Sequence, residues 1–125
     1  MFIREKDNVD GVDWGNGRSY RLLVENDGLN FAVAHTIVTA GSESRLQYTR
    51  HIEACYCVSG SGEVANADET EVYQLRPGTL YVLDRHDPHL LRAHSGEDLH
   101  LISIFNPPIT GTERHTLSAT GFSNY

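Results

Sequence analysis

Short apolar stretches separated by glycine and proline dominate the pattern of this chain. Seven stretches of five to ten residues are rich in Val, Ile, Leu, Tyr and Phe, and several alternate apolar with polar positions. They span residues 20–25, 30–39, 52–58, 71–75, 79–84, 89–94 and 99–105. Successive side chains of a strand point to opposite faces, so this pattern predicts short β-strands. Since no stretch carries a helical apolar stripe, we expect an all-β protein with little helix.

Many short strands in one small protein hide their edges best by closing into a sandwich or a jelly-roll barrel. With 125 residues, the chain is long enough for one hydrophobic core and too short for a second. We therefore expect a single domain over residues 1–125. The two ends are the least patterned parts, so we interpret 1–18 as an N-terminal arm or strand and 112–125 as a tail that could form a lid.

Charge and composition narrow the choice of partners. The 10 basic and 17 acidic residues give a formal net charge of −7, the wrong sign for binding nucleic acid or anionic lipid. No apolar run approaches the roughly 18 residues that span a bilayer, and the first residues do not resemble a secretory signal. Cys55 and Cys57 are poorly placed to bridge each other, so we expect both to be reduced. These features favour a cytoplasmic protein that acts on a small molecule.

The first candidate for chemistry is a carboxylate within an apolar strand. If 41–60 forms a strand, a turn and a second strand, alternation places His51, Glu53, Cys55 and Cys57 on one face. A carboxylate on the same face as two cysteines points inward. Burying its charge costs several kcal/mol unless something compensates. Glu53 is therefore a metal ligand, the partner of an arginine, or protonated.

A second stretch brings further ligand types nearby. The Asp87-Pro88-His89 turn returns the chain in the antiparallel direction, which predicts that His89 lies beside Tyr81. Glu53, Tyr81 and His89 would then form a mixed oxygen and nitrogen set that suits Fe(II), Zn(II) or Mn(II) acting as a Lewis acid. We interpret the other histidines of this stretch, at 86 and 94, as solvated or capping residues.

The spacing of several residues resembles the two-motif cupin barrels, which carry G-x5-H-x-H-x3-E-x6-G and G-x5-P-x-G-x2-H-x3-N. Gly41, Glu53 and Gly60 match the first motif in register, and Gly78 and His89 match the second. The two histidine positions of the first motif hold Gln47 and Thr49. This chain therefore keeps the cupin spacing but lacks the usual pair of histidine ligands.

That particular loss resembles one branch of the cupins, the ectoine synthases. The similarity covers nearly the whole chain, from residue 1 to about residue 115. It is carried by the segments 1–4, 21–23, 50–57, 77–81, 86–94 and 105–111. The sequence is thus identified as a member of that family, and a single-domain cupin barrel is the fold that the resemblance implies.

The resemblance implies an activity and a set of site residues. The family closes the ring of N-γ-acetyl-L-2,4-diaminobutyrate to ectoine, a compatible solute, with loss of water. The iron ligands of the family fall on Glu53, Tyr81 and His89. Candidate acid-base residues are Tyr48, His51, Glu113 and His115. Substrate-binding positions are Ser19, Thr36, Leu83, Asp87 and Phe105.

Fe(II) is the metal that the resemblance implies, with Zn or Mn as alternatives. The resemblance also implies that the protein assembles as a homodimer. From Tyr48 and His51 we expect positions flanking the metal, and from Glu113 and His115 contacts with the charged ends of the substrate. Gly17 stands where the family has a tryptophan, which predicts an open wall in the pocket. Two alternative functions are a binding protein for a small zwitterion and an enzyme of another reaction, such as hydrolysis of an N-acetylated amine or oxygen-dependent ring chemistry.

Overall fold

Strands make up nearly all of the regular structure. The computed structural model describes residues 1–125 and contains two short 3-10 turns, Lys6–Asn8 and Glu25–Asp27, but no α-helix. The strands are β1 (Gly11–Asp13), β2 (Arg18–Leu23), β3 (Ala32–Val38), β4 (Glu43–Gln47), β5 (Ile52–Ser59), β6 (Gly62–Asn66), β7 (Val72–Leu75), β8 (Leu80–Leu83), β9 (His89–Ala93), β10 (Leu99–Asn106) and β11 (Ser123–Asn124). The expectation of an all-β chain with little helix is confirmed.

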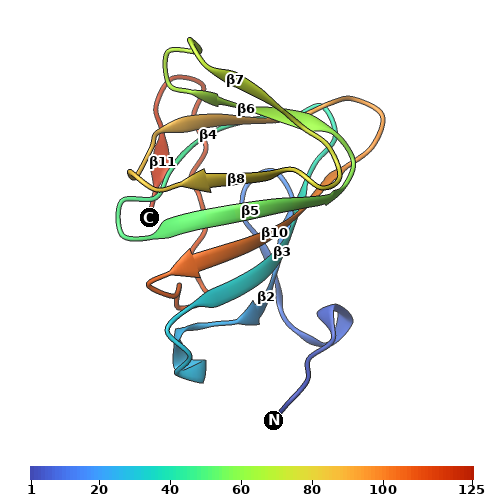
Figure 1. The fold of residues 1–125 in the computed structure, drawn as a ribbon, viewed down its shortest axis with the longest axis vertical. Helices are drawn as coiled ribbons and strands as arrows, with labels where there is room; N and C mark the ends of the chain where they lie inside the picture. Colours follow the sequence, from blue (N-terminus) through green and yellow to red (C-terminus); the bar gives the residue numbers. More distant parts are fainter.

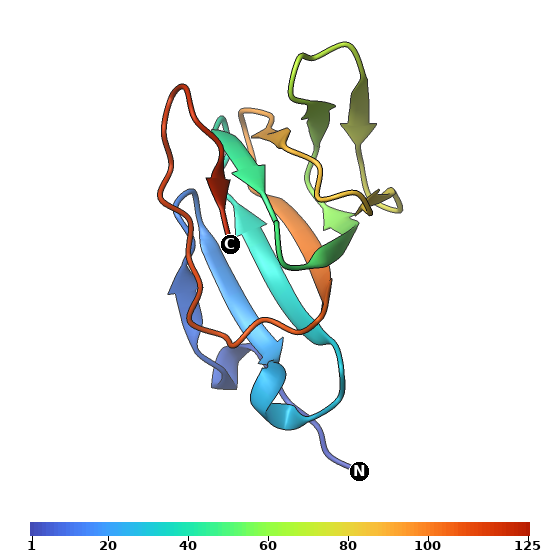
Figure 2. The ribbon, with the colours of Figure 1, turned by 90° about the vertical axis from the view of Figure 1, so that its left-hand side faces the viewer.

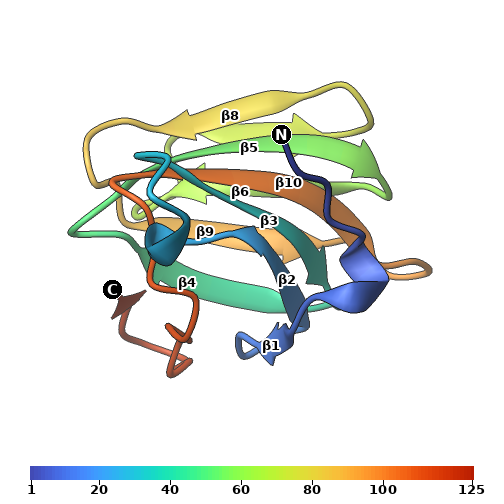
Figure 3. The same ribbon diagram turned by 90° about the horizontal axis from the view of Figure 1, so that it is seen from below.

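The strands form two sheets that face each other as a jelly-roll barrel (Figures 1 and 3). One sheet has the order β1-β2-β3-β10-β5-β8, and the other has the order β11-β4-β9-β6-β7. Neighbouring strands are antiparallel except β11, which runs parallel to β4. Strand β10 pairs with both β3 and β5, so the middle of the first sheet joins segments that lie far apart in the sequence.

The alternation expected for residues 52–58 is present in β5. Glu53, Cys55 and Cys57 are buried, whereas Ile52 and Tyr56 are exposed on the outer face. Both cysteines are free thiols, as expected from their spacing. The sequence pattern thus identified which face of this strand meets the interior.

Two apolar clusters fill the space between the sheets. The larger contains eleven buried residues, among them Trp14, Cys55 and Leu101. The smaller contains five, namely Ala32, Tyr48, Leu83, Phe105 and Ile109. Tyr81 packs against both clusters, so it lies where they meet. The boundary between the two apolar clusters therefore lies at Tyr81, one of the predicted metal ligands.

The turn at residues 87–89 was expected to return the chain so that 89–94 lies antiparallel beside 79–84. That pairing is wrong. Strand β8 pairs with β5 in one sheet, whereas β9 pairs with β4 and β6 in the other. The chain changes sheets through a corner in which His86 adopts a left-handed backbone conformation, with φ of 55°. Each strand finds its partners in a different layer, so Tyr81 and His89 line the interior from opposite sheets.

The barrel has two seams, where an edge of one sheet comes near an edge of the other. At the first, which we call the open seam, the edge strands are β7 and β8. At the second, the tail seam, the tail 112–125 joins the two layers: the His115 N–H donates to the Trp14 carbonyl (3.2 Å), and Tyr125 bonds β4 through the Gln47 carbonyl (3.3 Å). Figure 2 shows this tail in red, ending beside β4. Residues 112–125 therefore cover one side of the barrel.

Candidate active site and metal centre

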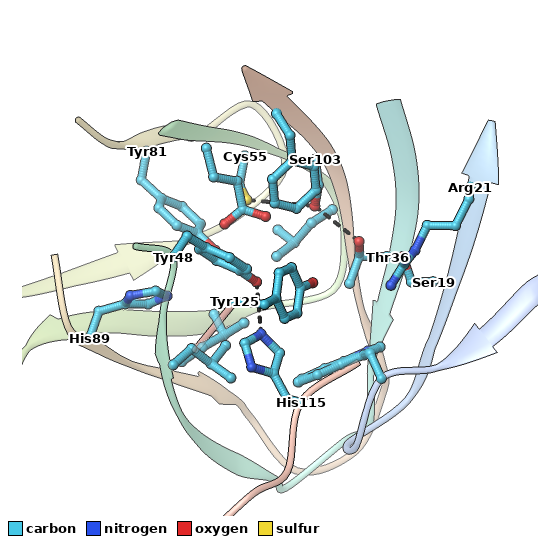
Figure 4. A pocket seen from close by; sticks show the side chains of 16 residues that line it. Ser19, Arg21, Thr36, Tyr48, Cys55, Tyr81, His89, Ser103, His115 and Tyr125 are labelled. Carbon is cyan, nitrogen blue, oxygen red and sulfur yellow. Dashed lines mark hydrogen bonds between the residues drawn. The ribbon is translucent and has the colours of Figure 1, made fainter. Parts of the chain in front are cut away.

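A cavity lies between the two sheets next to the tail seam (Figure 4). Sixteen residues from both sheets and the tail line it. They are Trp14, Ser19, Arg21, Thr36, Leu46, Tyr48, Glu53, Cys55, Tyr81, His89, Leu91, Leu101, Ser103, Phe105, His115 and Tyr125. With the tail in place, the free volume is about 20 Å³, which is room for about one water molecule.

The predicted metal ligands all line this cavity. Glu53, on β5, is 4% exposed, and burial raises the pKa of its carboxyl to about 8, against the opposing effect of hydrogen bonding with Cys55 and Ser103. No arginine or lysine pairs with Glu53, so without a bound cation its carboxyl is largely protonated at pH 7. A carboxylate in this setting is stabilised by a bound cation.

His89, on β9, supplies the clearest indication of a missing partner. Its Nδ1 lies 2.9 Å from the carbonyl oxygen of Asp87, an acceptor, so Nδ1 carries the proton and donates it. The lone pair is then on Nε2, which is buried and has no hydrogen-bond partner. Burial also lowers the pKa of His89, which keeps the ring neutral. This orientation, set by a backbone carbonyl, is typical of a metal-binding histidine.

Tyr81 completes the set from the opposite sheet. Burial raises the pKa of its phenol well above the usual value, with the nearby Cys55 and Glu53 adding to the effect. The residues therefore fit a divalent cation: one neutral imidazole with a free lone pair, and one carboxyl and one phenol whose ionised forms a positive charge would favour.

A second polar group lies on the tail side of the cavity. The hydroxyl of Tyr48 is 3.2 Å from Nε2 of His115, and Nδ1 of His115 is 2.9 Å from the Ser123 hydroxyl. Burial is the main cause that lowers the pKa of His115 to about 3, with the nearby His89 and Arg21 adding to the effect, so this ring is neutral at pH 7. Burial raises the pKa of Tyr48 well above 10, so its hydroxyl keeps its proton. Tyr48 is consequently a hydrogen-bond donor.

The cavity contains an arginine that the sequence interpretation missed. Arg21, on β2, is 7% exposed; its Nε donates to the Ser19 hydroxyl (2.8 Å) and one Nη donates to the Glu113 carbonyl (2.8 Å). The other Nη is buried without a hydrogen-bond partner and lies 3.9 Å from the Glu113 carboxylate. Figure 4 shows Arg21 and Ser19 on the side of the cavity opposite Tyr81 and His89. A buried guanidinium with a free N–H is suited to bind an anion.

A chain of hydroxyl and thiol groups crosses the floor between these ends. Thr36 and Ser103 are joined through their hydroxyls at 2.9 Å, and Ser103 lies 3.7 Å from the Cys55 sulfur (Figure 4). Ser19 and Phe105, the remaining candidates of this region, also line the cavity. The structure thus brings together three of the five predicted substrate-binding positions, Ser19, Thr36 and Phe105.

The other predicted site residues lie outside the cavity lining. Leu83 is in the smaller apolar cluster, and Asp87 accepts a hydrogen bond from the backbone of Arg85 (3.1 Å). His51 is bonded through Nδ1 to the Pro107 carbonyl (2.7 Å). Leu83 and Asp87 instead line a separate cleft at the open seam.

Glu113 is also not among the residues that line the cavity. Its carboxylate accepts hydrogen bonds from the backbone of Thr110 (2.8 Å) and Gly111 (2.9 Å). Burial opposes ionisation, but these bonds outweigh it and lower the pKa of Glu113. In this structure the carboxylate of Glu113 anchors the start of the tail, and its contact with substrate stays a prediction.

The expected gap in the pocket wall at Gly17 is filled by another residue. Trp14 lines the cavity and donates its ring N–H to the Ile37 carbonyl (2.9 Å). Its ring packs edge to face with that of His115, with the ring centroids 6.2 Å apart. Gly17 has φ of 143°, and a Cβ there would collide with the Ile37 carbonyl. The turn between β1 and β2 therefore excludes a side chain at 17 and supplies the aromatic wall from 14.

Some lining residues left a signal in the sequence and others did not. Arg21 shares a strand face with Ser19, so alternation alone places both inward. The ring of Tyr125 packs against the rings of Tyr48 and His115, with centroids 5.0 and 4.5 Å apart. Tyr125 lies, however, in a tail with no periodic pattern. Its position depends on the pairing of β11 with β4, which connects residues far apart in the chain.

The fold and the cavity define a small cupin barrel with an inward-facing set of oxygen and nitrogen donors. The model of the ectoine synthase family matches residues 1–122. The chain belongs to that family, and no helix in it is long and apolar enough to cross a membrane.

Relatives and solved structures agree with this assignment. The chain is 44% identical over 121 residues to an L-ectoine synthase of Desulfatibacillum aliphaticivorans, with 92% of each sequence covered. It is 42% identical to that of Halalkalibacterium halodurans, over 90% of this chain and 84% of the relative. It also resembles the crystal structure of ectoine synthase from P. lautus, with a TM-score of 0.82 and 36% sequence identity. The match covers 89% of this chain and 81% of that one. Enzymes of this family are metal-dependent lyases.

Proposed function

We propose that this chain is a metal-dependent ectoine synthase that closes the ring of N-γ-acetyl-L-2,4-diaminobutyrate with loss of water. The observation that carries the proposal is the division of one cavity into two ends. Glu53, Tyr81 and the unpartnered Nε2 of His89 lie at one end, and the free N–H of Arg21 lies at the other. The substrate has the same arrangement, with an amide carbonyl to be activated and a carboxylate to be held.

Arg21 holds the substrate carboxylate in this proposal. Its Nε and one Nη are already fixed by Ser19 and by the backbone of Glu113, so the guanidinium is oriented before the substrate arrives. The remaining buried Nη then gains the partner that it lacks. A charge-assisted hydrogen bond of this kind contributes about 1.5–3 kcal/mol. Thr36 and Ser103 provide hydroxyls along the floor between the two ends.

Glu53, Tyr81 and His89 would hold the metal. We propose Fe(II), because it accepts this mixture of carboxylate, phenolate and imidazole, with Zn and Mn as alternatives. When bound, a divalent cation polarises an amide carbonyl and stabilises the negative charge that forms on its oxygen. The role of these side chains is to supply that charge-stabilising centre in an interior closed to bulk water.

The protons of the reaction remain inside the cavity. Ring closure moves two protons from the attacking α-nitrogen to the oxygen that leaves as water, with no net uptake. The Tyr48 hydroxyl keeps its proton and is oriented by the neutral His115, so it can donate to the departing oxygen. A proton released by the nitrogen restores the hydroxyl. His51 and Glu113 support this arrangement by fixing the Pro107 turn and the start of the tail.

The tail 112–125 acts as a lid in this proposal. Tyr125 packs against Tyr48 and His115 and occupies the mouth of the cavity, leaving room for about one water molecule. A substrate larger than water requires Tyr125 to move out and the tail to close again over the bound molecule. Such closure would keep bulk water from a reaction that itself releases water.

The assembly and the cellular site remain proposals. A homodimer is supported by a large apolar patch on the outer face of the first sheet. Outside the cleft at the open seam, its exposed residues are Ile52, Tyr56, Val58 and Ile104. Exposed apolar side chains that gather on one face are typical of an interaction surface. We place the enzyme in the cytoplasm, in keeping with its two free cysteines.

The test is a chromatographic assay of the purified protein with N-γ-acetyl-L-2,4-diaminobutyrate, with and without anaerobic Fe(II). We expect ectoine to form only with metal. Tyr48→Phe should lower turnover about 10²-fold with metal content unchanged. Turnover of this variant within about threefold of the wild type would contradict the role of Tyr48. Hydrolysis of an N-acetylated amine, or oxygen uptake, without ring closure would replace the proposal with one of the alternative activities.

A further inference from the structure

The open seam contains a cleft that meets the metal-ligand end of the cavity from outside. This cleft has a volume of about 520 Å³ and lies between β6 and β7 on one side and β8 on the other. Tyr81 and His89 line both the cleft and the inner cavity, and they are the only residues common to the two. These two side chains therefore form the wall between the metal site and the outside of the barrel.

The cleft and the tail end of the cavity differ in their charged side chains. Glu71, Asp84 and Asp87 line the cleft, and no lysine or arginine does. None of these three carboxylates forms an ion pair with a basic side chain. The cavity, by contrast, contains the guanidinium of Arg21 at its tail end. A cleft lined by one sign of charge concentrates ions of the opposite sign, so the cleft attracts cations.

An unpartnered donor lies where the cleft ends. His89 is 2% exposed, its Nε2 has no hydrogen-bond partner, and its ring borders both spaces. Tyr81 keeps part of its surface exposed. Since Tyr81 and His89 line both the cleft and the cavity, these two side chains separate a cation that collects in the cleft from Glu53.

We propose that the open seam is the path by which the divalent metal ion reaches its site, separate from the tail seam through which the substrate passes. The proposal rests on the metal-dependent function given above. Two features of the tail seam argue against passage there: Tyr125 packs over the cavity mouth, and Arg21 places a buried positive charge beside it. The two seams would thus sort the cationic metal from the anionic carboxylate of the substrate.

The rate of Co²⁺ binding to the metal-free protein tests this path. Trp14 is the only tryptophan and lines the cavity, so its fluorescence quenching reports arrival of the ion in stopped-flow mixing. Asp84→Lys reverses a charge at the cleft without altering a proposed metal ligand. Glu97→Lys makes the same change in net charge on the exposed turn between β9 and β10, and serves as the matched control.

At low ionic strength, Asp84→Lys should slow Co²⁺ association about tenfold, and the difference should shrink in high salt. Glu97→Lys and Tyr125→Ala should each change the rate less than about twofold. All variants should bind one Co²⁺ per chain at saturation. Equal rates for Asp84→Lys and Glu97→Lys, or marked acceleration by Tyr125→Ala, would overturn the path while leaving the proposed function intact. Absence of Co²⁺ binding in the wild type would overturn both the path and the metal site.

Discussion

At the tail seam, the cavity is bordered by Arg21 and covered by the segment 112–125, whereas at the open seam Tyr81 and His89 adjoin a cleft that carries three carboxylates. The first side is closed by a segment with little regular structure, and the second is built from regular strands of the two sheets. The difference suits the proposed division of the barrel between two ligands of opposite charge. In that proposal, strands of the two sheets would hold the cation, and the tail would enclose the carboxylate of the substrate.

The largest expected effect comes from removing the carboxylate at the metal end. Glu53→Gln keeps the size of the side chain but removes the only carboxyl among the three donors, the group that ionises when a cation binds. We expect loss of stoichiometric metal and a drop in ring-closing activity of about 10³-fold, the scale for losing a main electrostatic contribution to catalysis. Metal analysis and product assay measure the two losses. The exposed Glu97→Gln is the control, and retention of metal by Glu53→Gln would contradict the assigned ligand set.

The next effect concerns the opposite end of the cavity. Arg21→Met removes the guanidinium but preserves much of the apolar stem, so we expect KM to rise roughly 30- to 100-fold while metal content is unchanged. Steady-state kinetics at several substrate concentrations separates KM from kcat. Arg18→Met, at an exposed position on the same strand, is the matched control. If metal binding falls with Arg21→Met, the two ends are not independent.

The dependence of stability on pH tests whether His115 is neutral in the folded protein. Burial lowers the folded-state pKa of His115 to about 3, against 6.5 in the unfolded chain. The unfolded state therefore binds the extra proton between these values, and stability present above pH 6.5 is lost as the pH falls toward 3. Relative to His115→Asn, the wild type should lose about 2 kcal/mol of unfolding free energy between pH 7 and pH 5. Denaturant unfolding at the two pH values measures it, and equal losses would show that His115 ionises normally.

The smallest effect is expected from loosening the lid. Tyr125→Ala removes the ring that packs on Tyr48 and His115 but leaves the donors and Arg21 in place. We expect kcat/KM to fall about tenfold, since the closed state is weakened and the reacting groups remain. Hydrogen exchange should show faster opening of 112–125. Tyr73→Ala, at a 59% exposed position of β7, should leave both measurements unchanged. Full activity of Tyr125→Ala would remove the lid role.

The sequence was most informative where a strand had one buried face. Alternation along 52–58 placed Glu53 inward, and the structure agrees, because burial of one face sets the register of a strand. The same rule would have found Arg21, which shares its face with Ser19. The hairpin expected between 79–84 and 89–94 failed because the choice between two sheets depends on partners elsewhere in the chain.

The tail shows the limit of local pattern more clearly. Nothing in residues 112–125 alternates, and β11 is a two-residue strand whose only partner is β4. The contacts of Tyr125 and the closed cavity therefore follow from tertiary packing, which no short stretch encodes. Trp14 is a similar case, since its place in the wall depends on a turn that admits only glycine at 17.

The most direct test of the account is an anaerobic titration of metal-free wild-type protein with Fe(II), with the rate of ectoine formation followed at each addition. We predict no product without metal, a rise in rate with each addition, and a plateau at one Fe(II) per chain that a chelator reverses. Ring closure by metal-free protein at the full rate, or a rate that does not depend on added metal, would contradict the claim that Glu53, Tyr81 and His89 hold a catalytic cation.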